Sequence, residues 1–145
     1  MTDHNLRDRV IRDYINGRIW DTNREFALVR KLVGEGHPKL ADFPLIHDYE
    51  WEVECGRTDL GRGDLVYTDG KGNFAVVEVK FIDISRSGST ARVKRTKSRT
   101  QVRNQAFVYA DAFRKMPGKD VITVRAFAYT DDIIHPGLIE VSSPR

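Results

Sequence analysis

The chain has 145 residues, of which 40% are hydrophobic and 31% are charged. This length and composition suit a single globular domain spanning residues 1–145. Its only cysteine, Cys55, excludes an intrachain disulfide and favours a reducing compartment, so we expect a cytoplasmic or nuclear protein. The sequence offers no apolar run long enough to span a membrane, and its four scattered histidines have no zinc-type spacing.

Positive charge is concentrated in one part of the chain. The net charge is only +3, yet residues 85–103 contain seven Arg and Lys side chains and no Asp or Glu. This basic segment leaves the rest of the chain net acidic, which predicts a local site for a polyanion such as nucleic acid. The alternative interpretation is a solvated, flexible loop. The position of the basic segment, directly after a charged strand and running into a helix, favours the binding of a polyanion.

Two helices are expected before the first strand. The first covers about residues 5–16, where apolar side chains recur at helical spacing: Leu6, Val10, Ile11, Tyr14 and Ile15. The second begins at Thr22, carries apolar residues between positions 26 and 33, and ends near Gly34. Thr22 and Glu25 fit a capping box at the start of this helix.

A strand is predicted at residues 49–55, where apolar and acidic side chains alternate. Such alternation places four side chains on the buried face: Tyr49, Trp51, Val53 and Cys55. It places three on the solvent face: Glu50, Glu52 and Glu54.

A β-hairpin is predicted next, formed by residues 64–68 and 74–82. Both segments are rich in β-branched and aromatic side chains, and the residues between them are the Asp, Gly and Asn typical of a tight turn. A turn centred on Lys71 would place Asp64 opposite Glu78.

A third helix is expected from about Ser98 to Met116, ended by Pro117-Gly118, and a buried strand at residues 121–129. After the first helix the element order is therefore α-β-β-β-α-β. This order predicts an α/β protein with a mixed central sheet flanked by helices.

Three charged side chains gather on the predicted hairpin. Side chains alternate along a strand, so Glu78 and Lys80 point to the same face, and Asp64 lies across from Glu78. Two like charges in this arrangement are destabilising unless a cation lies between them. Because Mg²⁺ binds one or two carboxylates and keeps water ligands for a substrate, we expect a Mg²⁺ site here.

The hairpin also carries two short motifs. Gly63-Asp64 and Glu78-Val79-Lys80 match an Asp and (Asp/Glu)-x-Lys pattern, with Gly in place of the usual Pro. Together with the element order over about residues 22–130, these motifs resemble the PD-(D/E)XK nuclease superfamily. The resemblance implies a restriction-endonuclease-like fold with an αβββαβ core.

Two further segments resemble particular branches of this superfamily. Gln105 and Tyr109 match the Gln-x-x-x-Tyr motif of the RecB-type branch, whose Gly-x-x-Asp element corresponds to Gly61 through Asp64. Residues 23–29 are similar to the first helix of archaeal Holliday-junction resolvases. In those proteins a Glu, here Glu25, supports the metal site.

The resemblance implies a deoxyribonuclease that depends on Mg²⁺ or Mn²⁺. The catalytic side chains that it implies are Asp64, Glu78, Lys80, Gln105 and Glu25. Asp64, Glu78 and the Val79 carbonyl would bind the metal, which generates or orients a hydroxide. Lys80 would orient or deprotonate the attacking water, and Gln105 would hydrogen-bond the water or the phosphate.

DNA is the expected partner, in a homodimer or a larger nucleic-acid-processing complex, and no membrane partner is expected. The side chains expected to contact DNA are Arg92, Lys94, Arg95, Lys97, Arg99, Arg103 and Tyr109. The basic ones would bind the backbone without reading sequence, so binding should weaken steeply with salt. Tyr109 has the alternative role of bracing its helix.

The matches also have structural alternatives: a salt bridge of Lys80 to Glu78 or Asp64, a helix cap for Glu25, and an i,i+4 contact between Gln105 and a core Tyr109. For the whole chain, the alternative function is a catalytically silent nucleic-acid-binding or assembly module with the same fold. The nuclease interpretation leaves exonuclease, endonuclease and junction resolvase open.

Overall fold

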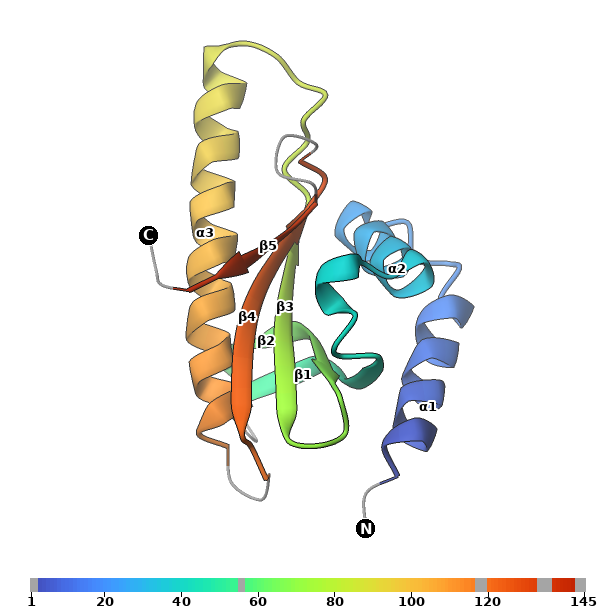
Figure 1. Cartoon of the computed structure of the whole chain (residues 1–145). Coiled ribbons are helices and arrows are strands. Elements are labelled where there is room, and N and C mark those ends of the chain that lie inside the picture. The colour runs from blue at the N-terminus through green and yellow to red at the C-terminus, as the bar shows by residue number, and fades with distance from the viewer. Residues whose placement is uncertain (1–2, 55–56, 117–119, 133–136, 143–145) are drawn as a thin grey trace.

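The computed structural model describes the chain except residues 1–2, 55–56, 117–119, 133–136 and 143–145 (Figure 1). Its elements are α1 (His4–Gly17), α2 (Arg24–Glu35), a 3-10 turn η1 (Pro38–Leu40), β1 (Leu45–Glu54), β2 (Arg57–Thr68), β3 (Asn73–Lys80), α3 (Ser89–Arg114), β4 (Thr123–Thr130) and β5 (Leu138–Val141). The prediction of an α/β protein with a mixed sheet and flanking helices is confirmed. None of the described helices is long and apolar enough to cross a membrane.

The five strands form one sheet in the order β1-β2-β3-β4-β5. β1, β2 and β3 form an antiparallel meander, β4 is parallel to β3, and β5 is antiparallel to β4. A parallel pair needs a long crossover connection, which α3 provides between β3 and β4. Figure 1 shows α3 along one face of the sheet and α1 and α2 on the other.

The sheet therefore separates two hydrophobic cores, and β3 contributes to both. Val77 and Val79 lie in the first core, which faces α1 and α2. Phe74 and Val76 lie in the second core, which faces α3. Because β3 is buried on both of its faces, its sequence is an almost continuous run of apolar residues, interrupted only by Glu78 near its end.

The start of α2 differs from the sequence prediction. Its N-cap is Asn23, whose side chain accepts hydrogen bonds from the backbone N–H groups of Glu25 and Phe26. The predicted capping box from Thr22 to Glu25 is therefore wrong. Asn is at least as good an N-cap as Thr, and Asn23 directly precedes the first residue of the helix. Glu25 is left to interact with another element.

The basic segment is mostly helical rather than a flexible loop. α3 begins at Ser89, well before the expected Ser98. Arg and Lys are good helix formers, but they give no apolar periodicity by which a helix start could be recognised. Figure 1 shows the first turns of α3 extending past the end of the sheet.

β1 does not keep the predicted alternation. Glu50 has a φ of 51°, a left-handed conformation that non-glycine residues rarely adopt. Tyr49 packs against the first core, whereas Trp51 is buried in the second. The prediction that both side chains share one face is therefore wrong, because the backbone turns between them. The predicted core side chains of Val53 and Cys55 lie outside the described part of the chain.

Candidate active site

The register of the β2–β3 hairpin is the one predicted from its turn. Leu65 pairs with Val77, and Thr68 pairs with Phe74 at the other end. The same register, continued by one residue, places Asp64 opposite Glu78. The turn is stabilised by Asp69, whose carboxylate accepts hydrogen bonds from the Lys71 and Asn73 backbone N–H groups at 2.7 Å and 3.2 Å.

Asp64 and Glu78 are each held by the backbone of the opposite strand. The Val79 N–H donates to Asp64 Oδ2 at 2.8 Å, and the Asp64 N–H donates to Glu78 Oε2 at 2.9 Å. Asp64 Oδ1 and Glu78 Oε1 accept no hydrogen bond from the residues that the structure describes. Two fixed carboxylates thus keep one oxygen each for another ligand.

The two carboxylates are costly to keep ionised together. Glu78 is only 1% exposed, and its burial, followed by the charge of Asp64, raises its pKa well above the usual value. Burial also raises the pKa of Asp64 to about 6, although the hydrogen bond from Val79 opposes this shift. A bound cation would relieve both the burial penalty and the mutual repulsion.

Lys80 forms an ion pair with Glu25, with 3.4 Å between Nζ and Oε1. The predicted alternative of a salt bridge to Glu78 or Asp64 is therefore replaced by a partner on α2. This contact connects the start of α2 to the end of β3. Both side chains stay partly exposed, so they form the open side of the site.

Gly63 is required by a neighbour that the sequence did not reveal. A Cβ at this position would overlap the indole ring of Trp51, which is buried in the second core. Gly63 therefore lets Trp51 lie against the strand directly before Asp64. This contact gives a physical reason for glycine at a motif position where the resemblance implies proline.

Gln105 contacts Tyr109, and Tyr109 in turn lies against Gly61 of β2. Gln105 Nε2 donates to the Tyr109 hydroxyl at 3.1 Å, so the predicted i,i+4 contact is confirmed. Tyr109 is buried, and a Cβ at Gly61 would lie 2.6 Å from its hydroxyl oxygen. Within the described residues, Gln105 makes no hydrogen bond to Asp64, Glu78 or Lys80. The roles of Gln105 in catalysis and of Tyr109 in DNA contact stay predictions.

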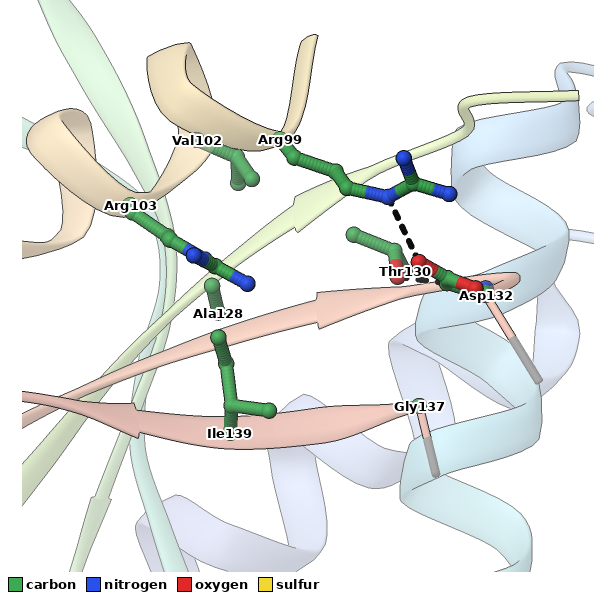
Figure 2. Close-up of a pocket in the computed structure, with 8 residues that line it drawn as sticks. All are labelled: Arg99, Val102, Arg103, Ala128, Thr130, Asp132, Gly137 and Ile139. Atoms are coloured by element: carbon green, nitrogen blue, oxygen red, sulfur yellow. Dashed lines mark hydrogen bonds and ion pairs between the residues drawn. The ribbon is translucent and has the colours of Figure 1, made fainter. Parts of the chain in front are cut away.

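A pocket lies between α3 and strands β4 and β5 (Figure 2). Glu78 pairs with Ala128 across the β3–β4 ladder, and Ala128 lies in the floor of this pocket. Paired residues on neighbouring strands are about 5 Å apart and point to the same face. The pocket is therefore only one strand away from Glu78.

Two arginines of α3 line the pocket from the opposite side (Figure 2). Arg99 Nε donates to Asp132 Oδ2 at 2.6 Å, and Asp132 is only 2% exposed. Arg103 forms no ion pair with any described residue. The pocket thus contains two guanidinium groups and one carboxylate, a net positive charge next to the site.

The remaining basic side chains divide between two faces of α3. Arg92, Arg95, Arg99 and Arg103 recur at spacings of three or four, which places them along one face. Val102 and Ala106, which pack in the second core, lie on that same face. Lys94 and Lys97 lie on other sides of the helix and are exposed. The arginine row therefore faces the sheet and the space beyond its end.

Sequence reasoning missed two aspartates directly after β4. Asp131 accepts hydrogen bonds from the backbone N–H groups of Ile82 and Ile84, which holds the chain where it leaves β3. Asp132 holds Arg99. The available signal was a pair of adjacent acidic residues following a buried strand, at the end of the sheet that carries Lys80.

The donor set suits a hard divalent cation. In the described part of the chain, no three His, Cys, Asp or Glu side chains are grouped closely enough to hold a metal by themselves. Two carboxylates are nevertheless what Mg²⁺ commonly takes from a protein, together with water ligands. The free oxygens and raised pKa values of Asp64 and Glu78 fit this requirement. The Val79 carbonyl stays a predicted third ligand.

Comparison of the chain with protein-family models, with curated proteins and with solved structures found no match.

Proposed function

We propose that the chain is a metal-dependent deoxyribonuclease of the PD-(D/E)XK type, with a restriction-endonuclease-like core at about residues 22–130. The observation that carries this proposal is the pair of carboxylates Asp64 and Glu78, each held by the backbone of the opposite strand, with Lys80 two residues beyond Glu78 on β3. The order α2-β1-β2-β3-α3-β4 supports it, because the resemblance implies this order.

Asp64 and Glu78 would hold Mg²⁺ or Mn²⁺ through the carboxylate oxygens that accept no backbone hydrogen bond. The Val79 carbonyl, next to Glu78 in the sequence, would be a further ligand. A divalent ion supplies Lewis-acid stabilisation of the phosphate charge and lowers the pKa of a bound water. The backbone N–H groups of Val79 and Asp64 keep both carboxylates oriented before substrate arrives. Such fixed donors avoid reorganisation during the reaction.

Lys80 is the side chain best placed to orient or deprotonate the attacking water. Its ammonium group has three N–H donors, and the ion pair with Glu25 occupies one of them. The other two are available for a water or a phosphate oxygen. Glu25 would act as a positioning residue that holds the ammonium group at the end of β3.

The arginine row of α3 supports a nucleic-acid substrate. Arg103 has no counter-ion among the described residues, and it lines a pocket with Ala128, the residue that pairs with Glu78 on the neighbouring strand. A guanidinium group binds phosphate in two-pronged fashion, so Arg103 would contact the phosphate next to the scissile bond. Arg92 and Arg95, in the first two turns of α3, would follow the DNA backbone outward.

A catalytically silent nucleic-acid-binding or assembly module is the second candidate. The basic face of α3 favours it, because binding needs these charges but not the carboxylates. It leaves the Asp64–Glu78 pair, which is costly to ionise, without a role. The two candidates therefore differ in what that pair should do.

Cleavage assays separate the candidates. Supercoiled, linear and branched DNA are incubated with the purified protein and Mg²⁺, Mn²⁺ or EDTA. We expect cleavage with either metal and none with EDTA. Glu78→Gln and Lys80→Met should each lower the cleavage rate at least about 100-fold, whereas Lys71→Ala, which removes an exposed charge at the turn of the same hairpin, should not.

Salt-sensitive DNA binding without cleavage, under every metal condition, would instead establish the silent module. Cleavage that survives Glu78→Gln would point to a contaminating nuclease and would remove the support for this site.

A further inference from the structure

Exposed apolar side chains are concentrated on α1 and the residues that follow it. Eight large apolar side chains are exposed in the described part of the chain, and five of them lie between positions 6 and 20. These are Leu6, Val10, Tyr14, Ile19 and Trp20, with exposed fractions from 52% to 74%. We call this group the α1 stripe.

The stripe lies on the face of α1 that points away from the sheet. Leu6, Val10 and Tyr14 are four residues apart, so they form one line along the helix. The inward face is anchored separately: Ile15 is buried in the first core, and Asp8 accepts a hydrogen bond from the Ile46 N–H at 2.7 Å. The helix thus has a second apolar face, whose three side chains are each more than half exposed.

Arg18 joins the helical part of the stripe to Trp20. Its guanidinium carbon lies 5.8 Å from the ring centre of Tyr14 and 5.1 Å from that of Trp20. Ion pairs with Asp21 at 3.0 Å and Glu50 at 2.9 Å hold it in place. The aromatic end of the stripe is therefore fixed in the single chain, which lowers the entropic cost of covering it.

The charges beside the stripe are complementary to those of a second copy. Arg9 and Asp13 are exposed along one side of it, and neither forms an ion pair within the described residues. A two-fold axis near Val10 would bring two α1 helices together antiparallel. Leu6 of each copy would then meet Tyr14 of the other, and Arg9 of each copy would lie near Asp13 of the other.

We propose that the helical part of the α1 stripe, Leu6, Val10 and Tyr14, is the interface of a homodimer in which α1 packs antiparallel against α1. Exposed apolar side chains aligned along one helix face are typical of protein–protein contact. A membrane surface is a poorer occupant, because Asp13 of α1 and the N-cap residue Asp3 are both exposed. One helix face is smaller than the ~800 Å² per partner of a standard interface, so the dimer should dissociate in the micromolar range.

Sedimentation velocity over a concentration series tests this proposal, and it does not depend on the proposed function. The wild-type chain should form a dimer as concentration rises. Val10→Asp should abolish dimerisation and keep the fold, because Val10 is 59% exposed. Val108→Asp, on the exposed side of α3, is the matched control and should leave the dimer intact.

Charge reversal tests the antiparallel arrangement. Arg9→Asp and Asp13→Arg should each weaken the dimer about tenfold. Each change gives positions 9 and 13 the same charge, and the two-fold axis places two such pairs across the interface. The double variant Arg9→Asp/Asp13→Arg restores opposite charges and should recover most of the wild-type affinity. Circular dichroism on each variant separates loss of the dimer from loss of the fold.

Three results would overturn the proposal. They are a monomer at all concentrations, a dimer that Val10→Asp does not disrupt, and a double variant no tighter than the single ones. Val10-dependent binding of a monomeric wild-type chain to vesicles of anionic phospholipid would assign the stripe to a membrane surface instead.

Discussion

At the scale of single residues, Glu78 is placed where function and stability oppose each other. Burial and the charge of Asp64 both disfavour its ionised form, and the metal-free protein carries that cost. Proteins commonly accept such local strain at sites that bind or react. The cost can be measured, because it should disappear when the charge is removed.

Glu78→Gln should stabilise the metal-free protein at neutral pH by about 1 kcal/mol or more, since it removes a buried like charge and keeps an acceptor for the Asp64 N–H. Urea unfolding in EDTA measures the change. Glu140→Gln is the matched control, because Glu140 forms a two-pronged ion pair with Arg125 at 2.6 Å and 2.7 Å. That variant should destabilise, and a destabilising Glu78→Gln would contradict the electrostatic account.

Asp64 should make the stability of the metal-free protein fall as pH rises. Its usual pKa is 3.8 and its pKa in the folded protein is about 6. Between these values the folded state binds more protons than the unfolded state, so the free energy of unfolding decreases with pH. The Asp64 contribution should be about 2 to 3 kcal/mol between about pH 4 and pH 7.

The difference between wild type and Asp64→Asn, from urea unfolding in EDTA across this range, isolates that contribution. Adding Mg²⁺ at neutral pH should restore stability to the wild type and leave the variant unchanged. A difference that does not vary with pH would show that Asp64 has an ordinary pKa.

Gly63→Ala should cost about 1 to 3 kcal/mol of stability, because its Cβ would overlap the indole of Trp51. Gly34→Ala is the matched control: Gly34 lies in α2 with nothing near its Cβ position, so alanine there should stabilise slightly. Thermal unfolding measures both. Equal effects of the two changes would show that Trp51 can move aside.

At the scale of elements, local and distant interactions differ in how well the sequence predicted them. The hairpin register could be derived because its turn residues are adjacent in sequence and fix the pairing. The existence and order of α1, α2 and α3 followed from apolar periodicity. The bend at Glu50 and the early start of α3 could not be derived, because they depend on tertiary packing and on polar residues without a period.

The same distinction applies to the candidate site. Asp64, Glu78 and Lys80 were brought together by one local hairpin. The contacts of Glu25 with Lys80 and of Arg99 with Asp132 join elements far apart in sequence. No periodicity encodes such pairs. The sequence therefore identified Glu25, Lys80 and Arg99 as candidate site residues but not these contacts, and it missed Asp132.

Arg99 and Arg103 should have separable effects although they line one pocket. Arg99→Ala leaves Asp132 buried without its arginine, which should cost about 3 kcal/mol of stability. Arg114→Ala breaks a half-exposed pair with Asp111 and should cost less than about 1 kcal/mol. Chemical denaturation gives both values.

Arg103→Ala should keep the fold and lower DNA cleavage about tenfold or more. Lys94→Ala, on the outer side of α3, should mainly lower the salt dependence of binding by about one unit of log–log slope. Cleavage rates and binding titrations at several salt concentrations distinguish them. If Arg103→Ala behaves as Lys94→Ala does, the pocket has no special part in the reaction.

At the scale of the whole molecule, β3 joins the two cores into one folding unit. Its alternate residues pack on opposite faces, and the carboxylate site lies at its end. Loss of either core should therefore remove support from the other. A protein built in this way should unfold in one cooperative transition rather than one layer at a time.

Two tryptophans allow this cooperativity to be tested. Trp20 is exposed, whereas Trp51 is buried in the second core. In the Trp20→Phe variant the fluorescence of Trp51 reports the second core alone, while far-ultraviolet circular dichroism reports all helices, including α1 and α2. We expect the two urea transitions to coincide, and Val77→Ala in the first core should shift both to lower urea by the same amount. Separate midpoints would show that α1 and α2 leave the sheet before α3, and the site would then lose Glu25 while Asp64 and Glu78 are still in place.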